Sequence, residues 1–426
     1  MSIALVEQLN FEKMMPISGN SKQQIAISVP STGAGTYNLA TYAIINLPRC
    51  GFDYVFDPMN SFLRFKATIV DAAGVLILDH SANSFIQKLE VLHAGNVLET
   101  IDNYQQLSAI LIDTQVDASA RVSSLNMTAG CGTDGDARGV MIENGAANGK
   151  WFSLTLLSGI VGSLSRNYIP VNDLQGSIQI RITFSDYKQV GNWTTNLQTG
   201  SNDAIKFSNI EFHANMIKLG PEVLSMIRTQ EYTIYSETYT NFQQTLAENT
   251  TQLEQLIPSR YSSLKTVFVS MRDSDVASNT GHQVYPNSRS SFGITDYCFR
   301  LGSEQIPPSR IRCKDYGFLE AFEALKTSLH GGGNTLCSIG ILNATNYIDE
   351  TPTGANENSY GLFVIGNDFE GYSSGKSGSL LAGANTLGND LYFSANFSAM
   401  AKSVIDFNLH YDMKLIIRDG VLTVHV

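Results

Sequence analysis

Runs of alternating apolar and polar residues recur along the chain and limit its fold more than any other feature. In SIQIRITFS (177–185), Ile178, Ile180 and Ile182 alternate with polar residues. A period of two residues is that of a β-strand with one buried face. Such runs, bounded by Gly, Asn, Asp or Ser, predict an all-β chain. The other runs are 61–70, 205–219, 263–272, 296–303, 336–342, 360–366, 390–398 and 403–426.

Helix signals are few. Residues 102–115 place apolar residues on one face, with Asp102 as the expected N-cap. Residues 220–230 and 316–333 carry similar patterns. The Asp419–Gly420 pair between two apolar runs predicts a tight hairpin turn near the end of the chain.

The chain has 426 residues, and the predicted helix 220–230 lies almost at its midpoint. Each flank holds enough strands for one eight-stranded β-sandwich, although the flanks share no obvious sequence repeat. We therefore expect an arm at residues 1–20, a first sandwich at 21–219, a linker helix at 220–230 and a second sandwich at 231–426.

Charged residues make up 16% of the chain and hydrophobic residues 43%. Ordinary soluble domains carry about 25% charged residues. This favours surface that is buried between subunits, or else one large core. The net charge of −11 gives no basic footprint for sequence-specific binding of nucleic acid. Six arginines between residues 260 and 312 are interpreted as scattered loop and strand-end charges: Arg260, Arg272, Arg289, Arg300, Arg310 and Arg312.

The cysteines are few and odd in number, and no CxxC pair occurs, which argues against a disulfide scaffold. They are Cys50, Cys131, Cys298, Cys313 and Cys337. The first 20 residues lack the basic and apolar regions of a signal peptide. No stretch approaches the ~20 apolar residues of a membrane span. We expect a soluble chain made in a reducing compartment.

Ser373 is the centre of a G-x-S-x-G sequence, and HGGG at 330–333 matches an oxyanion-hole motif. Asp390 or Asp406 with His410 would complete a hydrolase triad in the right chain order. The serine of such a motif must lie at a turn from strand to helix, but a Gly/Ser/Asn-rich loop follows here. We therefore expect no enzymatic activity.

Two binding motifs are also incomplete. GYSSGKS (371–377) lacks one residue of a phosphate-binding loop, and Glu370 would repel the anion. Asp134 and Asp136 could begin a calcium loop, but Arg138 occupies a ligand position. No metal site is expected from the histidines, which form no i,i+4 pair: His80, His93, His213, His282, His330, His410 and His425.

The stretch LEVLHAGNVLETIDNYQQL (89–107) gathers four residues of types that serve acid–base catalysis: His93, Glu99, Asp102 and Tyr104. The same stretch predicts a strand, a turn with positive φ at Gly95–Asn96, a second strand and the start of a helix. Each polar residue then has a structural position, and a hairpin with a helix cap does not by itself form a cleft.

DPMNSFLRFKATI (57–69) and residues 85–107 resemble the first half of double jelly-roll major capsid proteins. These belong to the adenovirus and tectivirus lineage, and the similarity is strongest to those of polinton-like viruses and virophages. Residues 156–185 and 260–303 extend the resemblance. It implies two eight-stranded jelly rolls side by side and pseudo-hexameric homotrimers that tile an icosahedral shell. It also implies no enzymatic activity and no cofactor.

The same resemblance implies a place in the virion capsid after synthesis in the host cytoplasm. Partners would be neighbouring capsomers, penton proteins and minor capsid or cement proteins. Three polar loops, 123–150, 273–291 and 366–390, would form the outer surface or trimer contacts.

The first 20 residues would tie neighbouring capsomers, or meet an internal membrane or a minor protein. The alternative is a terminal strand or helix on the chain's own barrel. The candidate contact residues of this arm are apolar: Ile3, Leu5, Val6, Leu9, Phe11 and Met14.

Two other functions fit an all-β chain. One is a glycan-binding β-sandwich of an attachment protein, which would favour clustered aromatic residues, but Trp151 and Trp193 are isolated in the sequence. The other is a β-sandwich hydrolase that uses Ser373.

Overall fold

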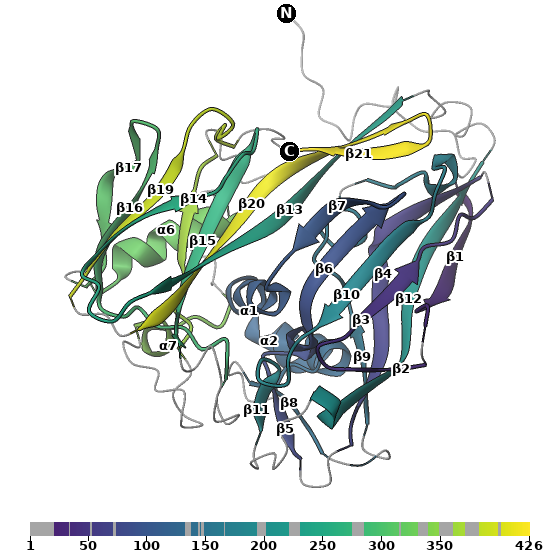
Figure 1. Cartoon of the computed structure of the whole chain (residues 1–426), viewed down its shortest axis with the longest axis horizontal. Helices are drawn as coiled ribbons and strands as arrows, with labels where there is room; N and C mark the ends of the chain where they lie inside the picture. Colours follow the sequence, from purple (N-terminus) through teal and green to yellow (C-terminus); the bar gives the residue numbers. More distant parts are fainter. Residues whose placement is uncertain are drawn as a thin grey trace, which may run out of the picture.

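The computed structural model contains two β-rich halves that lie side by side, with α1 and α2 in the seam between them (Figure 1). The structure describes residues 21–33, 35–51, 53–70, 74–132, 138–143, 145, 149–165, 167–193, 202–220, 231–274, 285–314, 317–330, 340–348, 361–370, 383–398 and 402–426.

Strands β1 to β12 form the first half and strands β13 to β21 form the second half. The strands of the first half are β1 (Ser21–Pro30), β2 (Thr36–Asn38), β3 (Tyr42–Asn46), β4 (Tyr54–Ile69), β5 (Leu76–Asp79), β6 (Ile86–His93), β7 (Asn96–Ile101), β8 (Arg138–Ile142), β9 (Lys150–Leu154), β10 (Ile178–Phe184), β11 (Gly191–Trp193) and β12 (Ile205–Leu219). Those of the second half are β13 (Glu231–Leu246), β14 (Gln252–Ile257), β15 (Leu264–Asp273), β16 (Ile294–Leu301), β17 (Glu304–Arg312), β18 (Ile365–Asp368), β19 (Leu391–Phe397), β20 (Ser403–Arg418) and β21 (Val421–His425).

Both halves have the same strand order. The first half pairs its strands as β1-β12-β4-β9 and β3-β10-β6-β7, and the second half as β13-β20-β15-β18 and β14-β19-β16-β17. When these eight main strands are numbered along the chain, both halves read 1-8-3-6 in one sheet and 2-7-4-5 in the other. This is the strand order of an eight-stranded jelly roll. The predicted fold class, two tandem jelly-roll sandwiches, is confirmed.

The remaining strands extend this frame. Strand β2 pairs with β12 and β21 pairs with β20, while β11-β5-β8 form a small third sheet in the first half.

The alternation seen in the sequence is the alternation of buried and partly exposed side chains. In β10, Ile178, Ile180 and Ile182 are at most 1% exposed, and the residues between them are partly exposed. Phe207 of β12 stacks on Phe184 with ring centroids 4.2 Å apart. Such packing of apolar side chains between two sheets is what makes the predicted strands stable.

The helices are short and occupy the connections between strands. They are η3 (Ala82–Phe85), α1 (Tyr104–Gln115), α2 (Ala118–Ala120), η4 (Arg121–Leu125), α3 (Asn126–Ala129), η6 (Val171–Asp173), η7 (Asn202–Ala204), α6 (Leu319–His330) and α7 (Ala344–Ile348). Within the described ranges, no helix has the length and apolar character needed to cross a membrane.

Helix α1 confirms the predicted helix 102–115, but its N-cap is Asn103 rather than Asp102. Asn103 has a φ of 48°, and Asp102 lies before it with its side chain 53% exposed. Helix α6 confirms most of 316–333. The predicted helix 220–230 lies, except for its first residue, outside the described residues.

The prediction of a continuous polar loop at 123–150 is wrong. The segment contains part of η4, α3, β8 and the start of β9. Its polar residues suggested a loop because serine and threonine favour turns. Here Ser123, Ser124 and Thr128 instead donate hydrogen bonds from their hydroxyls to carbonyls four residues earlier.

Two predicted strands are shorter or absent in the described residues. Within 336–342, residues 340–342 form a turn and an irregular segment, and the earlier ones are not described. Within 360–366, strand β18 begins only at Ile365. Residues 361–364 are nevertheless buried, so their apolar run reflects packing rather than a β-ladder.

One of the two predicted hairpin turns is confirmed, and the other is shifted by one residue. Asp419 and Gly420 have positive φ angles of 51° and 77°, which confirms the predicted turn between β20 and β21. In the first half, Ala94 and Gly95 have positive φ, at 50° and 83°, so the turn lies one residue earlier than the predicted Gly95–Asn96.

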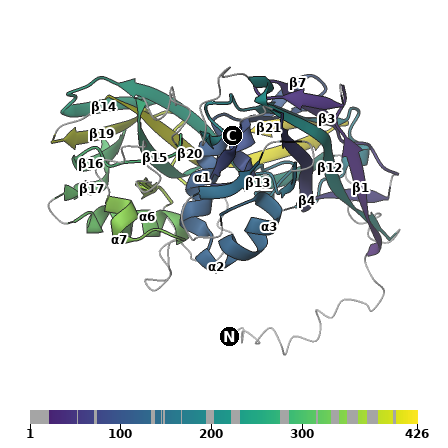
Figure 2. The same cartoon turned by 90° about the horizontal axis from the view of Figure 1, so that it is seen from below.

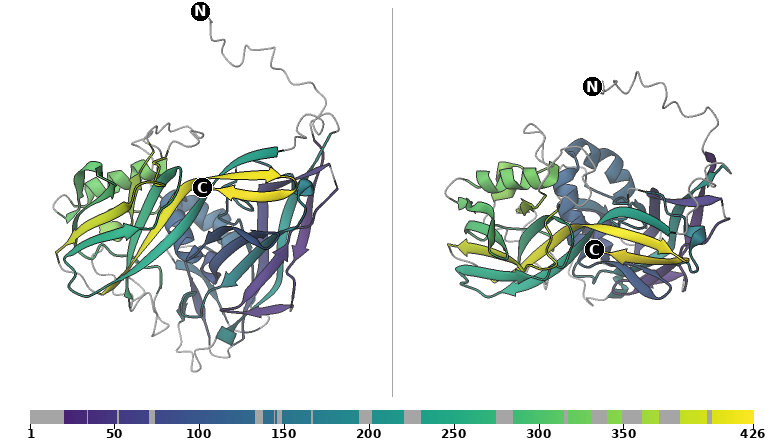
Figure 3. Two further views of the ribbon diagram at one scale, coloured as in Figure 1. Left: turned by 45° about the horizontal axis from the view of Figure 1, so that its top comes forward. Right: turned by 90° about the horizontal axis from the view of Figure 1, so that it is seen from above.

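The C-terminal hairpin of β20 and β21 reaches from the second half across the first (Figures 1 and 3). The backbone N–H of Gln175 donates to the carbonyl of Gly420 at 2.8 Å. The hydroxyl of Tyr232, at the start of β13, donates to Asp173 at 2.6 Å. The view from below shows α1, α2 and α3 between the sheets of the two halves (Figure 2).

Candidate functional site

The junction between the two halves is polar and almost fully buried. Helix α1 of the first half packs on the outward side of the second half's β13-β20-β15-β18 sheet. The amide Nε2 of Gln106 donates to Ser270 Oγ at 2.6 Å and to Asp406 Oδ2 at 2.8 Å. Gln106, Ser270 and Asp406 are all 0% exposed, so these hydrogen bonds satisfy groups that water cannot reach.

Asp113 of α1 is the centre of a buried cluster of charges. Its carboxylate accepts from NH1 of Arg121 at 2.9 Å and from NH2 of Arg289 at 2.6 Å, and it lies 2.6 Å from Nε2 of His80. These side chains are at most 2% exposed. Arg289 comes from the second half, so this carboxylate joins the two jelly rolls.

His80 extends the cluster toward a second carboxylate. Its Nδ1 lies 2.8 Å from Oδ1 of Asp79. The other oxygen of Asp79 accepts from the backbone N–H of Asn287, in the second half, at 2.8 Å. His80 has a φ of 63°, a left-handed conformation that is uncommon outside glycine and is adopted mostly by Asn, Asp and His.

The charges of the cluster set the direction of each pKa shift. Burial by itself lowers the pKa of His80, but Asp113 and Asp79 outweigh it and hold that pKa above its ordinary value. Burial raises the pKa of Asp113, but His80, Arg289 and Arg121 outweigh it and hold that pKa well below its usual range. His80 is therefore favoured in its charged form and Asp113 in its carboxylate form.

Glu99 forms a second buried connection between the halves. Its carboxyl group accepts from Ser158 and from the backbone N–H of Gly159, at 2.9 Å, within the first half. It also accepts from the hydroxyl of Thr238 on β13 of the second half. Burial raises the pKa of Glu99, and the hydrogen bonds offset this only in part.

Of the four residues noted in 89–107, His93 and Asp102 lie apart, whereas Glu99 and Tyr104 both contact the segment 157–159. Burial and the nearby Glu99 raise the pKa of Tyr104. His93 ends β6 and accepts from the N–H of Leu422 at 3.4 Å. The exposed Asp102 pairs with Lys88 at 3.4 Å. The hydroxyl of Tyr104 accepts a hydrogen bond from the backbone N–H of Leu157 at 2.9 Å.

The proposed partners of Ser373 also have separate positions. Asp390 pairs with Arg260 at the surface, at 2.9 Å, while Asp406 is buried against Arg272, also at 2.9 Å. His410 stacks on Tyr239 with centroids 4.4 Å apart. Ser373 and residues 331–333 lie outside the described residues.

Other candidates fall partly outside the described ranges as well. These include the arm residues Ile3, Leu5, Val6, Leu9, Phe11 and Met14, and the calcium-loop residues Asp134 and Asp136. Where the chain is described, no three His, Cys, Asp or Glu residues gather as metal ligands. The four cysteines in those ranges are free thiols.

The interpretation of the six arginines as scattered loop and strand-end charges is wrong for Arg272 and Arg289, which are 4% and 0% exposed at the junction. Residues 285–291, predicted to belong to a loop of the outer surface or of the trimer contacts, are buried there as well. The other four arginines each pair with an acidic residue: Arg260 with Asp390, Arg300 with Glu254, Arg310 with Asp296 and Arg312 with Glu320.

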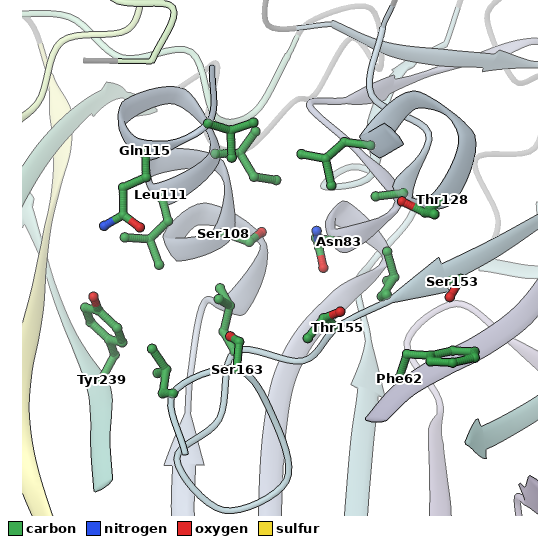
Figure 4. A pocket seen from close by; sticks show the side chains of 17 residues that line it. Phe62, Asn83, Ser108, Leu111, Gln115, Thr128, Ser153, Thr155, Ser163 and Tyr239 are labelled. Carbon is green, nitrogen blue, oxygen red and sulfur yellow. The ribbon is translucent and has the colours of Figure 1, made fainter. Parts of the chain in front are cut away.

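A pocket of about 580 Å³ lies beside the junction (Figure 4). Leu111 of α1, Thr128 of α3 and Ser153 of β9 line it from the first half. Tyr239 of β13 closes it from the second half, and Phe62 of β4 forms the opposite wall. Its lining is mostly apolar and brings no titratable pair together.

Comparisons with known proteins give no match to a protein-family model or, in sequence, to a curated protein. Solved structures match over nearly the whole chain. A PBCV-1 virus capsid structure matches with a TM-score of 0.65 at 11% identity, covering 97% of this chain and 99% of the other. A Sputnik virophage structure matches at 0.61 and 11%, covering 100% and 93%. The mavirus major capsid protein matches at 0.53 and 10%, covering 100% and 96%.

The chain therefore has the double jelly-roll fold of viral major capsid proteins. At this level of identity the agreement concerns the fold, and it confirms the resemblance that the sequence motifs indicated.

Replacing Asp113 by Asn should lower the free energy of unfolding by about 3–5 kcal/mol, because Arg121, Arg289 and His80 would keep buried charge without a counter-charge. Denaturant titration measures this. The matched control is Asp102→Asn, at an exposed ion pair on the surface, which should cost less than about 1 kcal/mol. Equal effects of the two substitutions would contradict the central place of Asp113.

The raised pKa of His80 predicts a loss of stability with alkaline pH. The folded protein holds this proton more tightly than the unfolded chain, so the stabilisation is complete below the unfolded pKa of 6.5 and is lost as pH rises through the folded value. His80→Asn, which tolerates the positive φ, should reduce the fall in unfolding free energy between mildly acidic and alkaline pH. An unchanged pH dependence in this variant would contradict the prediction.

Proposed function

We propose that this protein is a major capsid protein whose homotrimers form pseudo-hexameric capsomers of an icosahedral virus shell. The observation that carries the proposal is the repeated 1-8-3-6 and 2-7-4-5 strand order, which gives each chain two equivalent sandwiches. Three such chains supply six sandwiches around one axis.

The junction supports this function because it makes the two sandwiches one rigid unit. Buried charges and hydrogen bonds have strict geometric requirements, so the contacts of Asp113, Glu99 and Gln106 fix the angle between the halves. A capsid subunit that must contact identical subunits at constant angles needs this rigidity. The low share of charged residues, 16%, fits a surface largely covered by neighbours.

The partners in this proposal are further copies of the chain, penton proteins, and minor capsid or cement proteins. Residues 1–20 would tie neighbouring capsomers or contact an internal membrane. The virion capsid is the place of function, after synthesis in the host cytoplasm.

Purified protein should be a trimer of about 140 kDa, three times the 46.5 kDa chain. Light scattering measures the mass, and electron microscopy should show hexagonal particles or closed shells. A monomer that is retained on a glycan column would refute the proposal and favour an attachment protein.

Deletion of residues 2–19 should leave trimers intact and reduce their assembly into shells, because the apolar arm would no longer bridge capsomers. A full-length control with Ser at Ile3, Leu5, Val6, Leu9, Phe11 and Met14 separates loss of apolar contact from loss of length. Shells of unchanged yield and stability from both variants would show that the arm is not a tie.

A further inference from the structure

The contact between the two halves uses one face of the second jelly roll. This covered face consists of outward side chains of β13, β20 and β15: Tyr239, Asn241, Ser270, Arg272, Asp406 and Asn408. It packs on α1, the helix in the connection between β7 and β9. The burial is complete at its centre, where Ser270, Asp406 and Asn408 are 0% exposed.

The first jelly roll has the equivalent face, and this one is open in the single chain. Outward side chains of β12, β4 and β9 form this open face: Phe62, Arg64, Lys66, Trp151, Glu211 and His213. Trp151 is 50% exposed and the side chain of Arg64 is 42% exposed. The guanidinium of Arg64 lies over the Trp151 ring, 5.7 Å from its centroid.

The counterpart of α1 is α6, in the equivalent connection between β17 and β18. Helix α1 is buried over most of its length because both halves pack on it. Helix α6 packs on one side only and exposes a ridge made of Leu319, Glu323 and Thr327. Leu319 is 68% exposed and the side chain of Glu323 is 65% exposed. Among the described residues, the repeated topology thus leaves one face and one side of a helix exposed.

We propose that the open face of one chain packs on the α6 ridge of a second copy, and so repeats between chains the contact that α1 and the covered face make within one chain. This rests on the proposed trimer and names its contact surfaces. The strands β1 and β12 lie on one flank of the molecule and α6 on the opposite flank (Figure 1). Surfaces on opposite flanks suit a head-to-tail contact, which closes into a ring when the rotation permits.

The chemistry of both surfaces suits a protein interface. Aromatic residues and arginine are enriched at the centres of interfaces, and on the open face Arg64 lies between Phe62 and Trp151. Leu319 offers an apolar contact on the ridge. Arg64 pairs with Glu211 and Glu323 with Lys326 within the chain, so the apolar surfaces of Trp151 and Leu319 carry the contact.

Two single variants test the contact, Trp151→Asp on the open face and Leu319→Asp on the ridge. Each should raise the concentration needed for trimer formation by about tenfold or more, as loss of an interface hot spot does. An equimolar mixture retains one intact pair of surfaces and should give dimers of about 93 kDa, twice the 46.5 kDa chain, rather than trimers. Sedimentation velocity distinguishes these masses.

The controls match the variants in exposure and chemistry. Tyr42 is 58% exposed on the other sheet of the first half and lies beneath Arg181, 5.9 Å from its guanidinium carbon, as Trp151 lies beneath Arg64. Leu387 is 51% exposed. It lies beside the turn that precedes β17. This is the end of β17 that is remote from α6. Tyr42→Asp and Leu387→Asp should remain trimeric, and circular dichroism confirms that all four variants are folded.

The outcomes separate this inference from the proposed function. If the unaltered protein is not trimeric, the proposed function fails. If it is trimeric and either Trp151→Asp or Leu319→Asp still forms trimers at the original concentration, the inferred contact is wrong while the function stands. Trimers in the mixture would also overturn a head-to-tail arrangement.

Discussion

The arrangement of the two jelly rolls depends on the ion pairs that the carboxylate of Asp113 makes. This carboxylate is buried with Arg121 and His80 of its own half and Arg289 of the other, so the charge of Arg289 is paired only when both halves are in place. The net stabilisation by such a cluster is small after the cost of removing the charges from water. Removing one charged partner, however, strongly destabilises the folded state. The cluster therefore contributes a fixed geometry more than a gain in stability.

The two halves of the molecule share one fold but differ in which of their surfaces are buried. The strand order is the same in both halves, yet α1 is enclosed and α6 has an exposed side. The asymmetry arises because a chain with two jelly rolls makes one internal contact and leaves one contact surface on each jelly roll without a partner in the same chain. A closed assembly covers those surfaces, whereas an isolated chain exposes them to solvent.

The strands could be predicted because alternation is a local signal, and Ile178, Ile180 and Ile182 show it without knowledge of their partners. The junction could not be predicted in the same way. Asp113 and Arg289 are 176 positions apart, and ion pairing has no sequence period. Gln106 in α1 looks like a solvent-facing residue in the sequence, although it is buried against the second half. The serine-rich residues 123–128 concealed helical turns, since serine and threonine are also typical of loops.

The C-terminal hairpin has a consequence for how the chain folds during synthesis. Gln175 contacts Asp419, 244 positions later, so the first jelly roll emerges from the ribosome long before its last contacts exist. Until then Asp113 lacks Arg289, and the seam-facing side of α1 has nothing to cover it. The first half therefore keeps this polar seam exposed to water until the second half is made and packs on it. Translation of the final strands, rather than formation of the first sandwich, then becomes the step that commits each subunit to its native state.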